Sequence, residues 1–279
     1  MIPFNFDYYK PASIDEAVNI YEELSLKNRK PLYYSGGTEI ITLARNNKID
    51  TSAVIDIKGI PQCRMFEISE KEIIIGSAVS LSEISETNYF PLLKKATLFP
   101  ADHTTRDKIT IGGNICGEII YKEVVLPLLI SDCKVLISSK KGTRQVDLNQ
   151  VFDKKLLLEP GELLLQMRIN RENTGLPFYA VKIINQGVTG YPLISIAAVK
   201  KDNFIRVAIS GLCAFPFRSR KLDEAMNNKN MTIPQKTLAA LNLLPAPITQ
   251  DIQGSAEYKS FVFKNVLQEV LQSLGGKAK

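Results

Sequence analysis

The sequence contains few of the residues that usually bind metal ions. It has one histidine, His103, and four cysteines, Cys63, Cys116, Cys133 and Cys213. A single histidine excludes a multi-histidine metal site. No two cysteines form a C-x-x-C pair, and their spacing suits neither zinc nor an iron–sulfur cluster. We therefore expect four buried, reduced thiols and no metal bound by this chain.

Long hydrophobic runs and targeting segments are missing as well. No apolar stretch approaches the roughly 18 residues of a membrane span, and the N-terminal MIPFNFDYYK lacks the apolar core of a signal peptide. With 279 residues, 45% hydrophobic and 23% charged, the composition is that of a globular protein. We expect a soluble, cytoplasmic chain that is long enough for two domains and has no membrane partner.

Basic residues are in excess but are not clustered. The formal net charge is +6 at pH 7, and lysine pairs occur separately at 94–95, 140–141, 154–155 and 200–201. A nucleic-acid groove would need a contiguous basic stripe. A solvated basic surface is therefore the favoured interpretation, and no nucleic-acid partner is expected. The charge would also suit an acidic protein partner.

The N-terminal part of the chain predicts a small parallel sheet. The strand-like segments FNFDYYKP, PLYYSGG and SAVIDI alternate with two helix-like segments, and Ser13 with Glu16 forms the capping-box pattern before the first helix. The βαβαβ order favours parallel strands. It also places Gly36 and Gly37 at a strand-to-helix turn, where phosphates often bind.

Between residues 64 and 170 the pattern changes to short strands separated by helical segments. The strand-like runs are MFEIS, EIIIGSAV, KVLISS, TRQVDL and ELLLQMRI. Helices are expected near 80–99 and 122–131, with a second Gly-Gly pair in the loop before the later helix. Asn, Gly and Pro then cluster at 170–177, which predicts a domain boundary.

The C-terminal segment predicts three strands followed by three helices. FYAVKII, YPLISIAAVKK and NFIRVAISGL are strand-like, and helices are expected at about 219–227, 233–243 and 255–274. The last helix carries an apolar stripe, which we interpret as its core face, with partner binding as the alternative. The stripe consists of Tyr258, Phe261, Val262, Val266, Leu267, Val270, Leu271 and Leu274.

Two short stretches, SGGTE at 35–39 and TIGGN at 110–114, place Gly-Gly beside Thr and another polar residue. Neither matches GxGxxG or GxxxxGK[ST]. Without Cβ the backbone can approach an anion, and successive N–H groups can form a nest for phosphate oxygens. Thr38, Thr110 and Asn114 can add side-chain hydrogen bonds. A tight turn explains either loop alone, whereas the two together favour one dinucleotide whose pyrophosphate is held from both sides.

These loops resemble motifs of a known family, the FAD-binding subunits of molybdenum hydroxylases such as xanthine dehydrogenase and carbon monoxide dehydrogenase. SGGTEI at 35–40 resembles their (A/S)GGT(D/E)L loop, and RDKITIGGNI at 106–115 resembles their IRNxxTIGGN loop. The likeness covers nearly the whole chain. It continues through PGELL at 160–164, YAVK at 179–182, PFR at 216–218 and GSAEYK at 254–259.

The resemblance implies an α+β fold. A vanillyl-alcohol-oxidase-like (PCMH-type) FAD-binding domain in two subdomains would be followed by a C-terminal domain with an antiparallel sheet and three helices. The implied domains are 1–173, divided into 1–58 and 59–173, and 177–279. The boundary predicted from Asn, Gly and Pro fits this division.

The resemblance also implies which residues of the two loops hold the cofactor. Backbone N–H groups of the first loop would wrap the pyrophosphate, with glycine giving clearance, and the second loop would approach from the other side. The implied residues are Tyr33, Tyr34, Ser35, Gly36, Gly37, Thr38, Glu39, Ile40, Thr110, Gly112, Gly113 and Asn114.

Four further positions match the family, each with a simpler alternative. Glu123 stands where the family usually has Asp that bonds flavin-side hydroxyls, although it could be an exposed carboxylate at a helix start. Leu164 matches a position that touches the cofactor, and a buried strand leucine explains it as well. Lys182 would stabilise the reduced flavin, or be a surface lysine. Tyr191 would lie by the flavin ring, or pack as an ordinary strand residue.

Two segments depart from the family pattern. Thr105-Arg106-Asp107 replaces the usual Ile-Arg-Asn, and GEIIYKE at 117–123 replaces a segment usually richer in Ala, Ser, Pro and Asp. No inserted cysteine cluster occurs, so the extra iron–sulfur centre of some relatives is not expected. The family holds FAD non-covalently, so His103 is not expected to link it.

The function implied by the resemblance is electron transfer by a FAD-carrying subunit. Electrons would come from [2Fe–2S] clusters on a small partner subunit and leave to NAD⁺ or another acceptor. A large partner subunit with a molybdenum cofactor would hydroxylate the substrate. No side chain here would be catalytic, because the chemistry is the cofactor's. Two alternatives stay open: a self-sufficient flavin oxidoreductase with its own substrate pocket, and a fold relative that has lost FAD.

Overall fold

The computed structural model describes residues 2–185 and 190–275, which form two compact units. The first unit consists of Met1–Glu86, Asp102–Ile119 and Cys133–Arg171, and the second of Thr87–Ala101, Ile120–Asp132 and Glu172–Lys279. Two segments from the middle of the chain thus belong to the same unit as the C-terminal residues. The functional division into 1–173 and 177–279 stays a prediction.

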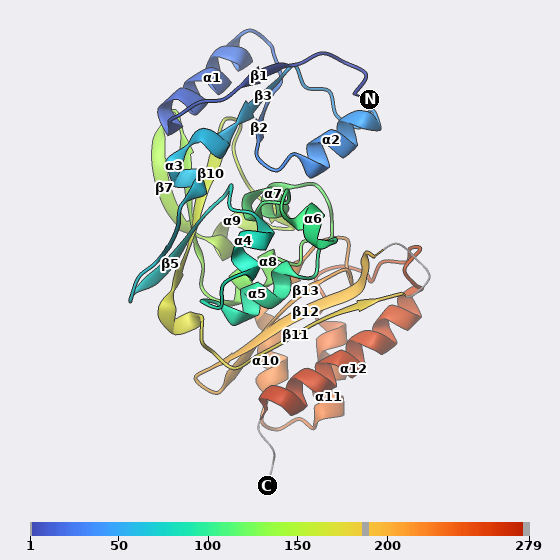
Figure 1. The fold of residues 1–279 in the computed structure, drawn as a ribbon. Coiled ribbons are helices and arrows are strands. Elements are labelled where there is room, and N and C mark those ends of the chain that lie inside the picture. The colour runs from blue at the N-terminus through green and yellow to red at the C-terminus, as the bar shows by residue number, and fades with distance from the viewer. Residues whose placement is uncertain (1, 186–189, 276–279) are drawn as a thin grey trace. The chain divides into compact units, whose positions relative to one another are not determined.

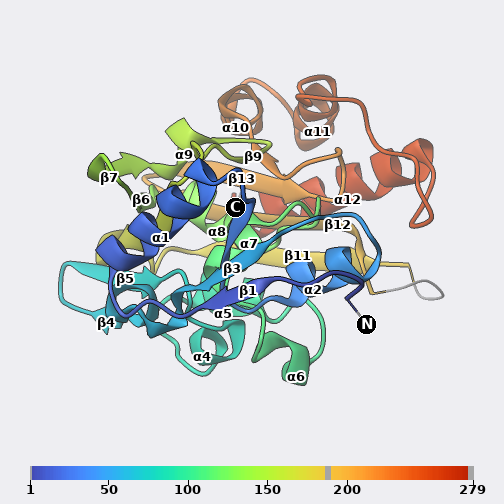
Figure 2. The same cartoon turned by 90° about the horizontal axis from the view of Figure 1, so that it is seen from above.

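The first unit begins with the parallel sheet that the sequence predicted. In this sheet β3 (Ala53–Asp56) lies between β1 (Asp7–Tyr9) and β2 (Pro31–Tyr34) and is parallel to both. Figure 2 shows β1 and β3 next to each other. Helix α1 (Ile14–Leu26) connects β1 to β2, and α2 (Thr38–Arg45) connects β2 to β3. The associated core cluster consists of Ala17, Leu24, Ala53, Ile55, Ile57, Ile60, Cys63, Ala78, Leu163 and Leu165.

The start of α1 differs slightly from the predicted capping box. The Ser13 hydroxyl accepts the N–H of Glu16 at 3.2 Å, as expected. The Glu16 carboxylate, however, accepts the N–H of Ala12 at 2.8 Å, where a capping box would use the N–H of Ser13. The carboxylate therefore still satisfies a backbone donor at the helix start, one residue earlier in the chain.

A five-stranded antiparallel sheet forms the rest of the first unit's framework. Its order is β4 (Phe66–Ile68), β5 (Glu72–Gly76), β10 (Leu163–Asn170), β6 (Lys134–Ser139) and β7 (Gly142–Asp147). The central strand β10 is buried along most of its length. Shorter elements of this unit are η1 (Ile57–Gly59), α3 (Pro61–Arg64), α4 (Leu81–Ser85), α6 (His103–Arg106), α7 (Ile111–Cys116), α9 (Leu148–Val151), β8 (Phe152–Asp153) and β9 (Lys155–Leu156).

The second unit is a layered structure around the predicted antiparallel sheet. The sheet order is β11 (Phe178–Ile184), β12 (Pro192–Lys201), β13 (Phe204–Ser210) and β14 (Phe217–Arg218), and η2 (Arg171–Asn173) precedes β11. One face carries α5 (Pro91–Thr97) and α8 (Val125–Ile130) (Figure 1). The other face carries the three predicted helices, α10 (Arg220–Asn227), α11 (Ile233–Asn242) and α12 (Ala256–Leu274).

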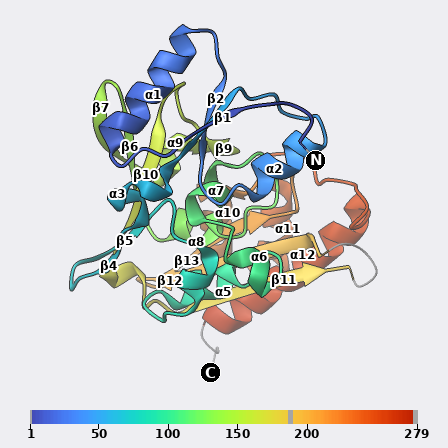
Figure 3. The same cartoon turned by 45° about the horizontal axis from the view of Figure 1, so that its top comes forward.

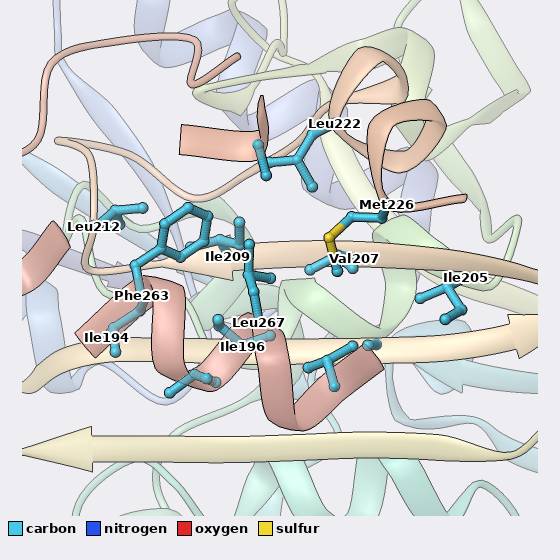
Figure 4. Close-up of a cluster of buried hydrophobic side chains, with 14 of the residues drawn as sticks. Ile194, Ile196, Ile205, Val207, Ile209, Leu212, Leu222, Met226, Phe263 and Leu267 are labelled. Atoms are coloured by element: carbon cyan, nitrogen blue, oxygen red, sulfur yellow. The ribbon is translucent and has the colours of Figure 1, made fainter. Parts of the chain in front are cut away.

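An apolar cluster of this unit lies between the sheet and these three helices. Figure 4 shows Phe263 and Leu267 of α12 beside Ile209 of β13, and Met226 of α10 beside Val207. Each of these side chains is fully buried. Alternating isoleucine, valine and alanine on the strands supply one side of the cluster, which is the pattern of a strand with one face on a core.

The predicted stripe of α12 is correct from Val262 onward and wrong at its first two residues. Tyr258 and Phe261 are 51% and 57% exposed, whereas Lys259 and Phe263 are fully buried. Lys259 faces inward because its Nζ donates to Asp251 Oδ2 at 2.7 Å and to two neighbouring oxygens. A buried ion pair thus occupies a core position that hydrophobicity cannot reveal. Neither α12 nor any other helix of the described residues is long and apolar enough to cross a bilayer.

The cysteines are buried in three cases out of four. Burial raises the pKa of Cys63 and Cys213 to about 11 and that of Cys133 to about 12. Cys116 is exposed, contrary to expectation, because it lies at the end of α7. Within residues 2–185 and 190–275, no three His, Cys, Asp or Glu side chains form a group that could hold a metal ion.

Candidate functional site

The first glycine loop joins β2 to α2 in the first unit. Gly37 has φ of 73°, in the left-handed region that favours glycine. Helix α2 begins at the next residue, Thr38, and no side chain of the described chain caps it. The first N–H groups of a helix have no acceptor within the helix. An uncapped start of this kind is suited to an anionic ligand.

The second predicted loop lies against the first. A Cβ atom placed on Gly36 would overlap the carbonyl oxygen of Lys108, two residues before Thr110. Only glycine allows this approach of two backbones at position 36. Figure 3 shows the helices that follow these segments, α2 and α7, near each other in the same unit. The structure therefore brings together the two stretches that the sequence singled out.

The Glu39 side chain links the first glycine loop to the backbone just after α7. Its Oε1 accepts the N–H of Glu118 at 2.9 Å and the N–H of Ile119 at 2.8 Å. A Cβ atom on Gly117 would overlap the Glu39 carboxylate, so glycine at 117 makes room for it. The carboxylate of Glu39 is thus used within the protein, and a contact with a ligand would come from its backbone.

The second Gly-Gly pair lies inside a helix, whereas the sequence predicted a loop before one. Helix α7 spans Ile111–Cys116. Thr110 is its N-cap, and the Thr110 hydroxyl accepts the N–H of Gly113 at 3.2 Å. The six-residue helix was missed because two adjacent glycines are poor helix formers. Its cap and its contacts with neighbouring backbone stabilise it instead.

The backbone N–H groups of this helix are used within the protein. Those of Ile111 and Gly112 donate to carbonyls of the segment 77–79 at 2.9 Å, and that of Asn114 donates to the carbonyl of Thr110. A Cβ atom on Gly112 would lie 2.6 Å from one of these carbonyl oxygens. Glycine here serves close packing of two backbones. Within the described residues, the second stretch thus uses its helix-start N–H groups internally, whereas no side chain caps the helix start of the first stretch.

One buried polar atom in each glycine stretch lacks a hydrogen-bond partner within the described chain. These atoms are the Oγ of Ser35 and the Oδ1 of Asn114. Asn114 is only 8% exposed. Buried polar atoms without partners are rare in folded proteins, and each calls for an explanation. A phosphate oxygen of a ligand held by the first loop would accept the Ser35 hydroxyl, and a hydroxyl or amide group of the same ligand would donate to Asn114 Oδ1. The residues present therefore fit a ligand that carries both phosphate and hydrogen-bond donor groups.

The side chains of two other predicted site residues, Tyr33 and Leu164, pack within the first unit. Tyr33 stacks on Tyr21 with ring centroids 5.1 Å apart, and its hydroxyl donates to the carbonyl of Gly161 at 3.0 Å. Burial raises the pKa of Tyr33 well above its usual range. Leu164 is 2% exposed within β10, as the alternative of a buried strand leucine states. Any contribution of Tyr33 to a ligand would come from its backbone.

Glu123 and Lys182 meet in the second unit. Glu123 Oε1 lies 3.5 Å from Lys182 Nζ, and their side chains are 4% and 12% exposed. Lys182 Nζ also donates to the carbonyl of Phe99 at 2.7 Å. Neither residue is the exposed surface group that the alternatives describe. A buried ion pair costs desolvation free energy, so its presence favours a functional role, which stays a prediction.

Tyr191 packs against another aromatic ring of the second unit. Its ring stacks on that of Tyr121 with centroids 4.9 Å apart and an interplanar angle of 22°. Tyr191 is 46% exposed and lies just before β12, so it is not an ordinary buried strand residue. A role beside a flavin ring stays a prediction.

Sequence reasoning overlooked Lys58, which touches the first glycine loop. Its Nζ donates to the carbonyl of Ser35 at 2.8 Å and lies 2.9 Å from Asp56 Oδ2. A signal was present in the sequence. The carboxyl ends of parallel strands lie at the same edge of a sheet, so polar residues just after β3 are expected near the loop that follows β2.

Comparison with known families and proteins finds relatives that match most of this chain. A family model described as "FAD binding domain in molybdopterin dehydrogenase" matches residues 4–171. The xanthine dehydrogenase FAD-binding subunit of Escherichia coli O157:H7 is 24% identical over 300 residues, covering 98% of this chain and 99% of that protein. The carbon monoxide dehydrogenase medium chain of Afipia carboxidovorans is 22% identical over 292 residues and is covered completely, as is this chain.

Solved structures share the fold over almost the whole chain. A carbon monoxide dehydrogenase from Hydrogenophaga pseudoflava gives a TM-score of 0.85 at 21% identity, covering 99% of both chains. Quinoline 2-oxidoreductase from Pseudomonas putida 86 gives a TM-score of 0.84 at 20% identity, again covering 99% of both chains. These likenesses confirm the fold that the sequence motifs implied.

Proposed function

The chain belongs to the family of the FAD binding domain in molybdopterin dehydrogenase, and from this premise we propose that it is the FAD-carrying electron-transfer subunit of a molybdenum hydroxylase. The observation that carries the proposal is the first glycine loop. Its uncapped helix start, left-handed Gly37 and buried Ser35 hydroxyl support the binding of a diphosphate there.

In this proposal the first loop holds the diphosphate of FAD through backbone N–H groups. The backbone of Lys108, just before the second stretch, packs against Gly36 and supports the first loop. The second stretch also offers the Asn114 side chain to the ligand. The proposed binding residues of the two stretches are Tyr33, Tyr34, Ser35, Gly36, Gly37, Thr38, Glu39, Ile40, Thr110, Gly112, Gly113 and Asn114. The binding is non-covalent.

FAD, when bound, supplies a redox centre that accepts electrons one at a time and releases them in pairs. The residues of this chain bind and orient it and set the local charge. We assign the buried pair of Glu123 and Lys182 to the flavin end, with Leu164 as an apolar contact. A lysine charge would favour the reduced, more negative flavin, and the Glu123 carboxylate would moderate that effect.

The proposed partners follow from the names of the relatives, which are FAD-binding subunits and medium chains of dehydrogenases. A small subunit with [2Fe–2S] clusters would deliver electrons to this chain. A large subunit with the molybdenum cofactor would oxidise the substrate. NAD⁺ or another acceptor would take the electrons from FAD.

The test is the visible absorption spectrum of the purified full chain, recorded before and after addition of FAD and again after desalting. We expect the two absorption bands of a flavin to remain after desalting. A colourless chain that also fails to retain added FAD would refute the proposal and favour a fold relative without FAD.

A second experiment separates an electron-transfer subunit from a self-sufficient oxidoreductase. The FAD-loaded chain is mixed under nitrogen with candidate organic substrates alone, and the flavin absorbance is followed. We expect no bleaching until the partner subunits are added. Bleaching by an organic substrate with this chain alone would favour a flavin oxidoreductase that has its own substrate pocket.

A further inference from the structure

Lys58 lies outside both glycine stretches, in η1 and two residues after the end of β3, yet its side chain ends against the first loop. Its Nζ donates to the carbonyl oxygen of Ser35 at 2.8 Å. It also lies 2.9 Å from Asp56 Oδ2 and 4.6 Å from the centre of the Tyr34 ring. Three groups therefore fix the position of one flexible side chain that is still 39% exposed.

Asp56 is the anchor of this arrangement. It is 2% exposed at the carboxyl end of β3, and its Oδ1 accepts the backbone N–H of Lys58 at 2.9 Å. The hydroxyl of Tyr8 donates to its other oxygen. Burial raises the pKa of Asp56, but the hydrogen bonds from Tyr8 and Lys58 outweigh burial and hold that pKa below its ordinary value. The carboxylate is therefore charged at neutral pH, and it holds the Lys58 ammonium in place.

The register of the parallel sheet explains why Lys58 reaches this loop. Tyr34, the last residue of β2, is paired with Asp56, the last residue of β3. The residues that follow, Ser35 and Lys58, therefore leave the sheet at the same edge. In a trans peptide the C=O and the next N–H point in opposite directions. By holding the carbonyl of Ser35, Lys58 fixes the direction of the N–H of Gly36.

We propose that Lys58 is a positioning residue for the diphosphate of the bound dinucleotide. It orients the Ser35–Gly36 peptide so that the N–H of Gly36 faces away from Lys58 toward the anion, and its positive charge favours a negative ligand at this loop. This inference rests on the proposed function for the identity of the ligand, but the loop geometry on which it depends is independent of that function.

The experiment compares Lys58→Met with a matched control, Lys30→Met, in the full chain. Lys30 is in the same unit and pairs with Asp50 at 3.0 Å, but its side chain is 69% exposed and contacts neither glycine stretch. Dissociation constants are measured by calorimetry for FAD and for inorganic pyrophosphate. We expect Lys58→Met to weaken both about tenfold, Lys58→Arg to recover most of the loss, and Lys30→Met to leave both unchanged.

A second readout reports on the loop itself. Amide hydrogen exchange of residues 35–38 is measured by mass spectrometry for each protein saturated with inorganic pyrophosphate. We expect faster exchange of this segment in Lys58→Met and no change in Lys30→Met, with similar thermal unfolding of the two variants. If Lys58→Met does not fold, Lys58→Gln replaces it in both measurements.

The outcomes separate this inference from the proposed function. If the wild-type chain binds FAD and Lys58→Met binds it equally well with unchanged exchange, the role of Lys58 is refuted and the proposed function stands. If the wild-type chain binds pyrophosphate in a Lys58-dependent way but does not bind FAD, the role of Lys58 stands and the proposed function is refuted. If it binds neither, both are refuted. A loss of thermal stability without a selective change in affinity or exchange would make Lys58 purely structural.

Discussion

At 35–39 the glycine pair precedes a helix, whereas at 110–114 it lies within one. Gly37 adopts a left-handed backbone, and the helix that follows has no side-chain cap within the described chain. In the other stretch, Thr110 caps the helix and the backbone N–H groups donate to protein carbonyls. Two stretches of similar composition thus have different structures, and in the proposed function the first presents donors to the ligand while the second packs against the first.

This difference shows that a Gly-Gly pair can serve two structural purposes, which its surroundings distinguish. Glycine at 36 and at 112 permits contact with another backbone, with Lys108 in one case and Ser77 in the other. Only at 37 does glycine supply a positive φ next to a free helix start. Close packing and anion binding therefore both require glycine, and the partners of the neighbouring N–H groups distinguish them.

The largest effect should come from Gly36→Ala compared with Gly113→Ala. The new Cβ at 36 would overlap the Lys108 carbonyl, so we expect the free energy of unfolding to fall by about 3 kcal/mol and FAD binding to be lost. At 113 the nearest atom is Thr110 Oγ1 at 3.0 Å, and alanine favours helix by about 1 kcal/mol, so stability should change little. Urea unfolding and FAD titration measure both. Equal losses would contradict the distinction between the two stretches.

An intermediate effect is expected for Glu39→Ala, which removes the carboxylate that joins the first stretch to the backbone just after α7. Two backbone N–H groups would lose their charged acceptor, so unfolding should become about 2 kcal/mol more favourable. Glu16→Ala is the control, because Glu16 also accepts a backbone N–H in this unit but lies in an exposed helix start. Stability and FAD affinity should both fall more for Glu39→Ala. If the two variants lose the same stability and affinity, the contact of Glu39 with the segment after α7 does not support the first stretch.

The smallest and most selective effect should separate two threonines. Thr110→Ala removes a helix N-cap and should cost about 1 kcal/mol of stability. Thr38→Ala removes no cap, so stability should be nearly unchanged while FAD affinity falls about threefold through loss of a hydroxyl at the ligand loop. Thermal unfolding and calorimetric titration of both variants provide the test. The reverse pattern would assign ligand binding to the second stretch.

Local sequence patterns predicted most elements of the fold, since periodicity and turn residues depend on near neighbours. The order of β1, β2 and β3 and the three C-terminal helices were recovered in this way. The same patterns failed at α7, where adjacent glycines form a helix, and at Lys259, where a charged side chain is buried. In both cases contacts outside the local segment determine the outcome.

The candidate site was only partly predictable for the same reason. The two glycine stretches were found from their composition and from family motifs. Glu39 contacts the backbone at 118 and 119, which lies 79 and 80 residues away in the sequence. A pattern of neighbouring residues cannot predict a contact over that distance. Lys58 was within reach of sequence reasoning, because strand order in a parallel sheet specifies which residues share an edge. The pairing of Glu123 with Lys182 required the structure.

The second unit is built from three separate segments of the chain, and this has a consequence for folding during translation. A nascent chain emerges from its N-terminus, so every segment of the first unit is present once Arg171 has been added. Helices α5 and α8 have been made by then, but the strands β11, β12 and β13 that cover them have not. Until those strands follow, the apolar side chains of Leu92, Leu93, Leu126 and Leu129 lack their final partners. Exposed apolar surface makes a partly folded chain prone to aggregate, and a premature stop soon after residue 171 would make the exposure permanent.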